Sequence, residues 1–471
     1  MVKNRNIAEK IKQAGFFIKT GSLLFVLTIL ALIAGFSPLY AEEDYRIYVL
    51  ACPFFTITDE MSLSGLLSAV KGDPGEDSEI RSVLLSPDAA EDLPVFLSVP
   101  EDKITADAAG RIGTEDGSVT CAVIPIDELT PAMKAIQLNH SLFPWDEIYD
   151  PRMDVLAAPG KPSNFDPDRV STVLLTGTTA FARTVAWEMS VKGATYPGSM
   201  IKSVFDTSDI THISNESSIW SLCPEPQREN RSIQFCSNLN AYEMIDYLGV
   251  DVIELTGNHL RDYDWGPLLE MLDRFDEKGY AYYAAGRNYE EAAKPLTVEH
   301  NGNHFAFVGC NIAGPDHVYV DDRHPGVNPC DLDVFEQQIR GLTEDGYLVI
   351  ATLQYYEIYS RTPSEIQERD FKRLSDAGAV IVSGSQAHYP QTMVPKEDRF
   401  IHYGLGNLFF DQMDVPVKGT RQEFLDRYVF YDGRLLNVQL VTALLEDYSR
   451  PRQMTDEERA VFLRDVFERC E

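Results

Sequence analysis

The stretch VDVIELTGNHLRDYDWGPLLEMLDRFDEKG, residues 250–279, shows the pattern that decides the fold. Its first six residues form a mostly apolar run with the composition of a buried strand. Its last twelve residues have apolar side chains at helical spacing and end at Gly279, as helices often do. The polar residues between these segments include Asn258 and His259, so we expect this pair to lie directly after the end of a strand.

The same order of strand, polar cluster and helix recurs through the rest of the C-terminal part of the chain. Strand-like runs are VSTVLL, HFAFVGC, YLVIAT, AVIVSG and FIHYGLG, and SEIQERDFKRLSDAG predicts a second helix. This alternation predicts an α/β fold, in which ligands bind beyond the strand ends. We assign residues 170–445 to this domain. Residues 446–471 are predicted to be a C-terminal helical tail, in which Thr455 and Glu458 have the spacing of a capping box.

Residues 45–165 are predicted to form a separate, small α/β domain. It opens with the strand-like run YRIYVLACPFF and closes at the linker-like stretch AAPGKPSNFDPD. The segment DELTPAMKAIQL, residues 127–138, predicts a helix with Thr130 as N-cap and Pro131 as its first residue. The stretch CAVIPIDELTPAMKAIQL, followed by WDEIYDP, resembles part of a periplasmic binding-protein domain. No constellation of chemically reactive residues is apparent in this domain.

The N-terminus has the features of an export signal. Residues 1–19 contain five basic side chains and one acidic side chain, and residues 20–41 are uncharged. The small residue Ala41 precedes an acidic stretch, as at a signal-peptide cleavage site. The uncharged stretch is also long enough to span a bilayer. Residues 1–41 are therefore either a cleaved signal peptide or an uncleaved membrane anchor. In both cases the positive N-terminus predicts an exported protein, secreted or anchored to the cytoplasmic membrane.

The charge balance excludes one class of partner. The chain of 471 residues contains 41 basic and 73 acidic side chains, and its formal net charge is −32. Nucleic-acid binding needs a basic surface that is not visible here, so we expect no nucleic-acid partner. Docking of the folded body on anionic lipid is disfavoured for the same reason, and solubility alone would also explain the acidity.

All seven cysteines follow the export segment. An exported protein can form disulfides, and the lack of a CxxC motif gives no support to zinc-ribbon or thioredoxin-like folds. Cys223 and Cys236 flank one loop-like stretch and are the preferred pair, and Cys310 with Cys330 is the second. Because the count is odd, one cysteine remains outside any disulfide, and we expect this to be Cys470.

Polar clusters stand where successive strands of the C-terminal domain are expected to end. They contain Thr178, Arg183, Glu216, Asn258, His259, Gln354, Glu357, Gln386, His388 and Asn407. An Asn-His pair after a strand is typical of metal-assisted phosphoester sites, because the amide oxygen and the imidazole nitrogen are both metal ligands. Each cluster alone also fits an ordinary turn or a structural histidine. Six clusters at successive strand ends together favour one shared site.

The motif order is similar to that of the CapA family. The motifs are TGTTAFAR, NE, TGNHLRDYDWG, AAGRNYEEAAKP, QYYEIYS, GAVIVSGSQAHYPQ and YGLGNLFFDQ, and they cover about residues 170–445. That family includes capsule and poly-γ-glutamate synthesis proteins and resembles the calcineurin-like metallophosphoesterases in fold. The resemblance implies two sheets packed face to face, with helices on the outside.

Several expected metal-ligand positions differ from the family pattern. Thr178 stands where the resemblance implies a metal-binding Asp, Gln354 stands in place of a His, and Ser385 and Gln386 replace a pair that supplies another His. The retained candidates for metal ligands are Glu216, Asn258, His259 and His388. They would hold at most one divalent ion, such as Mn, Zn or Fe, and threonine and glutamine are poor ligands for these metals. The other interpretation is a metal-free polar pocket.

Three functions remain open from the sequence. The resemblance implies an exported protein that acts in synthesis, export or handling of an anionic cell-surface polymer of the capsule or poly-γ-glutamate type. A second hypothesis is a single-metal hydrolase of phosphoester or amide bonds, with His259 and His388 as catalytic residues. A third is a non-catalytic module that binds a solute or a surface. The candidates for contact with a polymer, substrate or small anionic ligand are Thr178, Arg183, Gln354, Glu357, Gln386 and Asn407.

Overall fold

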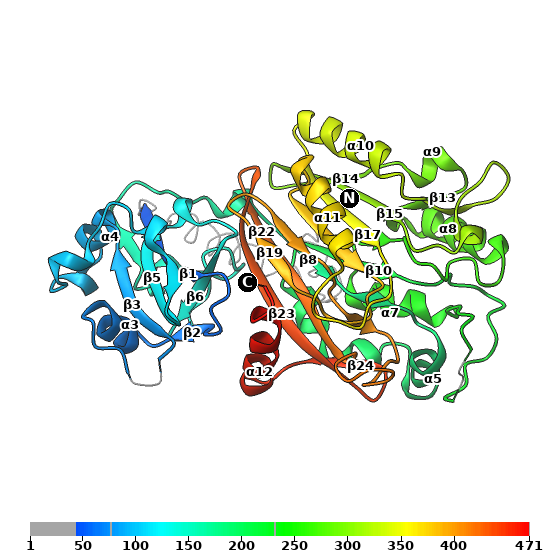
Figure 1. Ribbon diagram of the computed structural model, residues 1–471, viewed down its shortest axis with the longest axis horizontal. Coiled ribbons are helices and arrows are strands. Elements are labelled where there is room, and N and C mark those ends of the chain that lie inside the picture. The colour runs from blue at the N-terminus through cyan, green and yellow to red at the C-terminus, as the bar shows by residue number, and fades with distance from the viewer. Residues whose placement is uncertain (1–43, 76–77, 230–231, 471) are drawn as a thin grey trace, which may run out of the picture.

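The computed structural model describes residues 44–75, 78–229 and 232–470. The predicted export signal or anchor at residues 1–41 lies outside these ranges. Within them, no helix is both long enough and apolar enough to cross a membrane. Figure 1 shows a smaller N-terminal unit, coloured blue to cyan, beside a larger C-terminal unit.

The N-terminal unit is built on a mixed sheet with the strand order β2-β6-β1-β5-β3, with β4 beside β5 and β7 beside β1. The strands are β1 (Tyr45–Pro53), β2 (Glu60–Met61), β3 (Ile80–Leu85), β4 (Gly113–Glu115), β5 (Ser118–Pro125), β6 (Met133–Leu138) and β7 (Ala157–Pro159). Helices α3 (Leu63–Val70) and α4 (Pro87–Asp92) cover one face, where they share an apolar core with β1, β3 and β5. The other face is also apolar and packs against the C-terminal unit.

The predicted helix at residues 127–138 is wrong. Only one 3-10 turn, Ile126–Glu128, forms at its start, and Met133–Leu138 is a strand of the sheet. This strand pairs antiparallel with β1, with Ala135 opposite Ala51. Pairing on both sides and burial between neighbouring strands override the weak helical preference of these residues. The linker-like stretch at 157–168 likewise begins with β7, which pairs with β1.

The C-terminal unit contains two larger sheets and a short pair of strands. The first sheet has the order β12-β11-β10-β8-β22-β23-β24, with β9 and β21 attached at its side. Its strands are β8 (Val170–Thr176), β9 (Thr178–Thr179), β10 (Ile210–Asn215), β11 (Val252–Glu254), β12 (Ala281–Tyr283), β21 (Asn407–Phe409), β22 (Gln422–Tyr431), β23 (Arg434–Glu446) and β24 (Arg450–Gln453).

The second sheet has the order β14-β15-β17-β18-β20-β19. Its strands are β14 (Leu296–His300), β15 (Asn303–Asn311), β17 (Leu348–Gln354), β18 (Ile381–Ser385), β19 (Met393–Pro395) and β20 (Phe400–His402). The short pair is β13 (Ala285–Gly286) with β16 (Gly326–Val327).

Helices flank the two sheets of the C-terminal unit. The helices are α5 (Arg183–Lys192), α6 (Lys202–Asp206), α7 (Asn240–Leu248), α8 (Trp265–Lys278), α9 (Tyr289–Ala292), α10 (Leu332–Glu344), α11 (Glu365–Asp376) and α12 (Asp456–Phe467). Short 3-10 helices lie at Pro94–Phe96, Glu101–Lys103, Ala109–Arg111, Pro151–Met153, Pro167–Arg169, Pro197–Met200 and Asp316–Val318. Helices α5, α7 and α8 share a core with the first sheet, and α10 and α11 share one with the second. A third core fills the space between the sheets and includes Phe305, Phe307 and Tyr428.

The predicted fold class is therefore confirmed: a two-sheet α/β sandwich is flanked by helices and preceded by a small α/β unit. Each strand-like run of the C-terminal domain forms a strand. Helix α8 ends at Gly279, whose φ of 76° places it in the left-handed region, and α11 is capped by Ser364. The capping box of Thr455 and Glu458 is present at the start of α12.

The two units meet along β22 and β23, the long orange-to-red strands in Figure 1. Asn437 Nδ2 donates a hydrogen bond to the carbonyl oxygen of Met133 at 3.0 Å. Arg434 donates to the carbonyl oxygens of Leu129 and Asp127, both at 2.9 Å. An apolar cluster is shared by both units, so side-chain packing and backbone acceptors together fix the contact.

Disulfides connect distant parts of the described chain. They are Cys52–Cys121, Cys223–Cys236 and Cys310–Cys330. The second and third confirm the predicted pairs. The first joins the neighbouring strands β1 and β5 across 69 residues of sequence, and no local pattern in the sequence indicates it. Cys470 takes part in none of these disulfides, as expected.

A buried carboxyl group in β22 makes stability depend on pH. Glu423 is fully buried, and neither of its carboxyl oxygens has a hydrogen-bond partner among the described residues. Burial raises the pKa of Glu423 well above its ordinary value. The folded state therefore keeps a proton that the unfolded state releases above about pH 4.5, and the free energy of unfolding falls as pH rises through this window.

We expect Glu423→Gln to remove this contribution. Its free energy of unfolding should decline less steeply than that of the parent between pH 5 and pH 8, by at most about 1.4 kcal/mol per pH unit. Denaturant unfolding at both pH values measures the difference. Glu290→Gln, which changes an exposed carboxyl in α9, is the control and should keep the slope of the parent. Equal slopes for Glu423→Gln and the parent would contradict the assignment of a protonated buried carboxyl.

Candidate functional site

The side-chain amide of Gln354 lies at the centre of a buried polar network. Gln354 is the last residue of β17. Its Nε2 donates to Asn258 Oδ1 at 3.1 Å, to Glu216 Oε1 at 3.3 Å and, in a short contact, to Gln386 Oε1. Its Oε1 accepts a hydrogen bond from Ser385 Oγ at 2.9 Å. One amide nitrogen therefore faces three oxygen acceptors, and its two protons are shared among them.

The network combines residues that follow strands of both sheets. Glu216 follows β10 and Asn258 follows β11, two neighbouring parallel strands of the first sheet. Ser385 ends β18, which runs parallel to β17 in the second sheet. Because the carboxyl ends of these strands lie at one edge of the sandwich, residues far apart in sequence meet there. The sequence prediction that these polar clusters form one shared site agrees with this geometry.

A close backbone approach holds the Asn-His motif against the segment that contains Glu216. A Cβ atom at Gly257 would lie 2.5 Å from the carbonyl oxygen of Glu216 and 2.6 Å from its Cα. Only glycine fits without a backbone shift, because the obstructing atoms belong to the main chain. Glu216 is fixed from the other side, since its N–H donates to the carbonyl oxygen of Thr179 at 2.8 Å.

Two imidazole rings are oriented in the same manner beside this network. His259 Nδ1 lies 2.6 Å from Asp262 Oδ2, and His388 Nδ1 lies 2.8 Å from Asn407 Oδ1. Asn407 Nδ2 donates to backbone carbonyl oxygens, so its Oδ1 faces the ring and Nδ1 of His388 is the donor. Among the described residues, Nε2 of neither ring takes part in a hydrogen bond; His388 is buried and His259 is partly buried.

Arg183 stands over two aromatic rings that also contact the histidines. Its guanidinium carbon lies 4.6 Å from the ring centre of Phe235 and 5.2 Å from that of Phe410. The ring of Phe235 is 4.0 Å from that of His259, and the ring of Phe410 is 4.5 Å from that of His388. A short ion pair joins Arg183 Nη2 to Asp411 and leaves Nη1 and Nε free to donate. One cation and two imidazoles thus share an aromatic wall.

Several site residues have an unusual backbone conformation. Arg183, Gln386 and His388 have φ angles of 49°, 75° and 52°, in the left-handed region that non-glycine residues rarely adopt. Each such residue costs of order 1 kcal/mol and is maintained only where the surrounding structure enforces it. Strain of this kind clusters at binding and catalytic sites, so it supports a functional role for this edge of the sandwich.

Two of the predicted residues lie away from the centre. Glu357 is exposed, but a relay connects it to the site: Tyr359 donates to Glu357, Gln412 Nε2 donates to Tyr359 at 3.0 Å, and Asn407 Nδ2 donates to Gln412 at 3.2 Å. Thr178 is fully buried. Its hydroxyl accepts a long hydrogen bond from the backbone N–H of Gln386 at 3.4 Å, which makes it a support for that residue.

Burial shifts the pKa values of two acidic side chains in the interior of the site. Burial raises the pKa of Glu216, although the nearby His388 and His259 lower it in part. Burial also raises the pKa of Glu254, which lies close enough to interact with Glu216, to about 7. Burial therefore opposes the charged form of both carboxyl groups.

The residues present do not fit a dinuclear metal centre. Such a centre needs a bridging carboxylate and several anionic or imidazole ligands. Here the oxygens of Glu216, Asn258 and Gln386 face the Gln354 nitrogen, a hydrogen-bond donor that occupies the space between them. In the part of the chain that the structure describes, no three His, Cys, Asp or Glu side chains form a group that could hold a metal ion. The sequence also predicts a set of ligands for at most one metal ion, and catalytic roles for His259 and His388. Both stay predictions.

Phe235 is the site residue that the sequence analysis missed. It lies just before Cys236, in a loop closed by the disulfide to Cys223, and no strand or motif precedes it. Its backbone N–H donates to Asp262 Oδ2 at 2.7 Å, which fixes the carboxylate that orients His259. The one available signal was an aromatic residue next to a cysteine, which is too common to indicate a site.

The architecture defines a two-sheet α/β protein with a polar site at the carboxyl ends of strands from both sheets. Within this class, the family model described as bacterial capsule synthesis protein PGA_cap matches residues 172–412, which is more than half of the chain. The protein belongs to that family, and the CapA resemblance seen in the sequence is confirmed.

Individual relatives match a smaller part of the chain. The capsule biosynthesis protein CapA of Bacillus anthracis is 27% identical over 190 residues, which are 40% of this chain and 46% of that protein. The PGA biosynthesis protein CapA of Bacillus subtilis strain 168 is 25% identical over 190 residues, 40% of this chain and 49% of that protein. The match thus spans about half the length of these relatives.

Among solved structures, a 5'-nucleotidase precursor from Thermus thermophilus aligns with a TM-score of 0.36 and 14% identity, over 64% of this chain and 58% of that one.

We expect Gly257→Ala to disturb the site and to lower stability. The added methyl group forces the Glu216 backbone away from the Asn-His motif, at a cost of about 1–3 kcal/mol. Thermal unfolding measures the loss. Gly266→Ala is the matched control, because its Cβ meets no atom within 4 Å, and it should leave the unfolding midpoint nearly unchanged. The same midpoint for both variants would contradict the close approach.

Proposed function

We propose that this protein acts in the synthesis, export or handling of an anionic cell-surface polymer of the capsule type, and that it binds carboxylates of the polymer at the site around Gln354. The family description and the names of the two Bacillus relatives support a capsule-related role. Because those relatives are matched over only about half their length, the polymer and the step remain part of the proposal.

One observation supports the binding role most directly. The imidazoles of His259 and His388 and the guanidinium group of Arg183 contact the same two aromatic rings, those of Phe235 and Phe410. Carboxylates form their strongest hydrogen bonds with cationic donors such as guanidinium and protonated imidazole, and because Nδ1 of each ring holds the proton of the neutral form, Nε2 donates to a carboxylate only when the ring is protonated. Asp262 and Asn407 fix the two rings before a ligand arrives, so little conformational freedom is lost on binding.

The charges near this site make the proposal compatible with an acidic protein. The chain has a formal net charge of −32, which repels a polyanion at long range. A bound segment must therefore rely on local contacts, and the raised pKa values of Glu216 and Glu254 reduce the negative charge at the point of contact. Such binding should depend on a few residues rather than on a broad surface.

We also propose that the folded body acts outside the cytoplasm. The disulfides of the described chain support this location, since disulfides form and persist in oxidising compartments. A capsule-related role also supports this location, because a capsule polymer lies outside the cell.

The test is binding of a defined oligomer of γ-linked glutamate to the body of the protein, measured by calorimetry at low and moderate salt. We expect the parent to bind at both salt concentrations, because the proposed contacts are local and salt screens the long-range repulsion between the acidic chain and the oligomer. The double variant His259→Ala and His388→Ala should bind at least about tenfold more weakly, which corresponds to a loss of about 1.4 kcal/mol.

His304→Ala is the matched control, because it removes an exposed histidine on β15 outside the site, and it should bind like the parent. No binding by the parent, or equal binding by the double variant, would contradict the proposal. Shortening of the oligomer by the parent, abolished by a chelator, would instead favour the hydrolase hypothesis.

A further inference from the structure

A cavity lies between the two units, away from the site around Gln354. It has a volume of about 410 Å³, and its walls come from both units. Lys134, Asp59 and Asp146 line it from the N-terminal unit, and Arg427, Asp456 and Arg459 line it from the C-terminal unit. A volume of this order is typical of small-molecule sites, and such sites often lie between domains.

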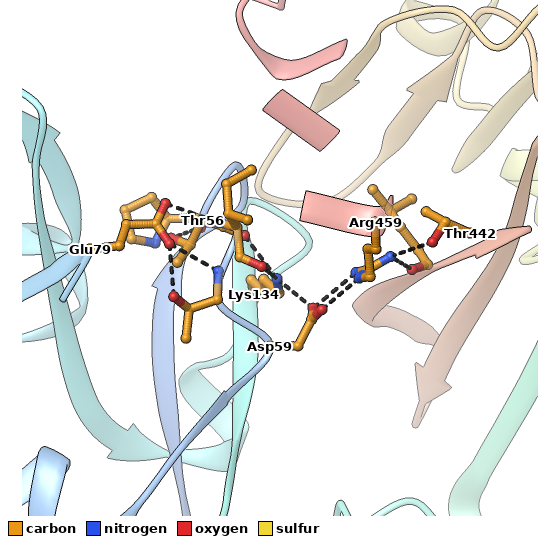
Figure 2. Close-up of polar contacts among 10 residues, drawn as sticks. Thr56, Asp59, Glu79, Lys134, Thr442 and Arg459 are labelled. Carbon is orange, nitrogen blue, oxygen red and sulfur yellow. Dashed lines mark hydrogen bonds and ion pairs between the residues drawn. The ribbon is translucent and has the colours of Figure 1, made fainter. Parts of the chain in front are cut away.

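Part of the cavity wall is a fixed ion cluster, shown in Figure 2. Asp59 accepts from Arg459 Nη2 at 2.9 Å and pairs with Lys134 Nζ at 2.6 Å. Lys134 also donates to the carbonyl oxygens of Thr56 and Ile57. Burial alone would raise the pKa of Asp59, but the hydrogen bond from Arg459 and the charge of Lys134 lower it to about 2. These three charges satisfy one another across the contact, so they form a rigid wall rather than a ligand receptor.

Arg427 differs from this ion cluster, because only some of the N–H donors of its guanidinium group have hydrogen-bond partners. It is 7% exposed and lies on β22, where it faces the cavity. Nη1 donates to Gln439 Oε1 at 2.6 Å and to Asp146 Oδ1 at 3.2 Å. Nε is buried without a partner, and Nη2 has no partner either in the described part of the chain but remains accessible. Because Nε is buried and Nη1 is already hydrogen-bonded, Nη2 is the donor of Arg427 that remains for a ligand in the cavity.

The lining also shows which acceptor fits. Its cations are Lys134, Arg427 and Arg459, and its acids are Asp59, Asp146 and Asp456, so the formal charges cancel. The carboxylate of Asp456 is exposed and makes no hydrogen bond or ion pair with any residue that the structure describes. One cation and one acid on the same lining are thus available to a ligand with both charges. A neutral, partly enclosed cavity disfavours a polyanion.

We propose that this cavity binds a zwitterionic ligand of amino-acid or dipeptide size, with its carboxylate on Arg427 and its ammonium group toward Asp456. This inference does not depend on the capsule-related function, because the two sites share no residue. A ligand held by both units would also stabilise their contact, since it binds only when the cavity is formed.

The test screens the twenty free amino acids and glycylglycine at millimolar concentration against the protein by thermal unfolding, followed by calorimetry on those that raise the midpoint. We expect at least one to bind the parent and Arg427→Gln to weaken its binding at least tenfold. The ligand amide, which lacks the carboxylate, should not bind.

Arg434→Gln is the matched control, because Arg434 joins the same two units through the carbonyl oxygens of Leu129 and Asp127 but does not line the cavity. It should bind like the parent. If Arg427→Gln does not fold, Arg427→Lys serves as the second test. It keeps the charge but loses the forked donor geometry, so it should bind the ligand more weakly than the parent. No binding by the parent, equal binding by the Arg427 variant, or equal binding of the amide would overturn the inference.

Discussion

A single amide nitrogen, Nε2 of Gln354, faces the oxygens of Glu216, Asn258 and Gln386, and the rest of the site depends on this convergence. In a site built for a cation, three such oxygens would face the metal ion. Here an amide nitrogen faces them and shares its two protons among them, while Glu216 Oε2 is buried without a hydrogen-bond partner among the described residues. The result is a buried polar network in which most, but not all, polar atoms have a partner.

The two-sheet architecture makes this convergence possible. Strands β10 and β11 of one sheet and β17 and β18 of the other end at the same edge, so four loops meet there. Gly257 allows two of these loops to touch, and the strained backbone of Gln386 and His388 turns the fourth loop into the site. The imidazoles of His259 and His388 and the guanidinium group of Arg183 then share the aromatic wall formed by Phe235 and Phe410.

Much of this could be predicted from the sequence, because strand ends and polar motifs are local signals. The runs before Asn258 and Gln354 were correctly predicted as strands, and the replacement of metal ligands that the resemblance implies stays a prediction. The helix predicted at Thr130 failed because pairing with β1 outweighed local preference. The roles of Phe235 and Arg427 could not be predicted from the sequence. Phe235 lies in a loop and Arg427 lies at the contact between the two units, and both positions depend on tertiary packing that no local pattern encodes.

The amide nitrogen of Gln354 occupies the point at which the oxygens of Glu216, Asn258 and Gln386 converge. The most direct measurement is anomalous diffraction from crystals of the protein soaked in manganese chloride. The account predicts no anomalous peak between Glu216, Asn258 and Gln386, with the Gln354 side chain in place. A peak there, within about 2.2 Å of the carboxylate and amide oxygens and with Gln354 displaced, would contradict it.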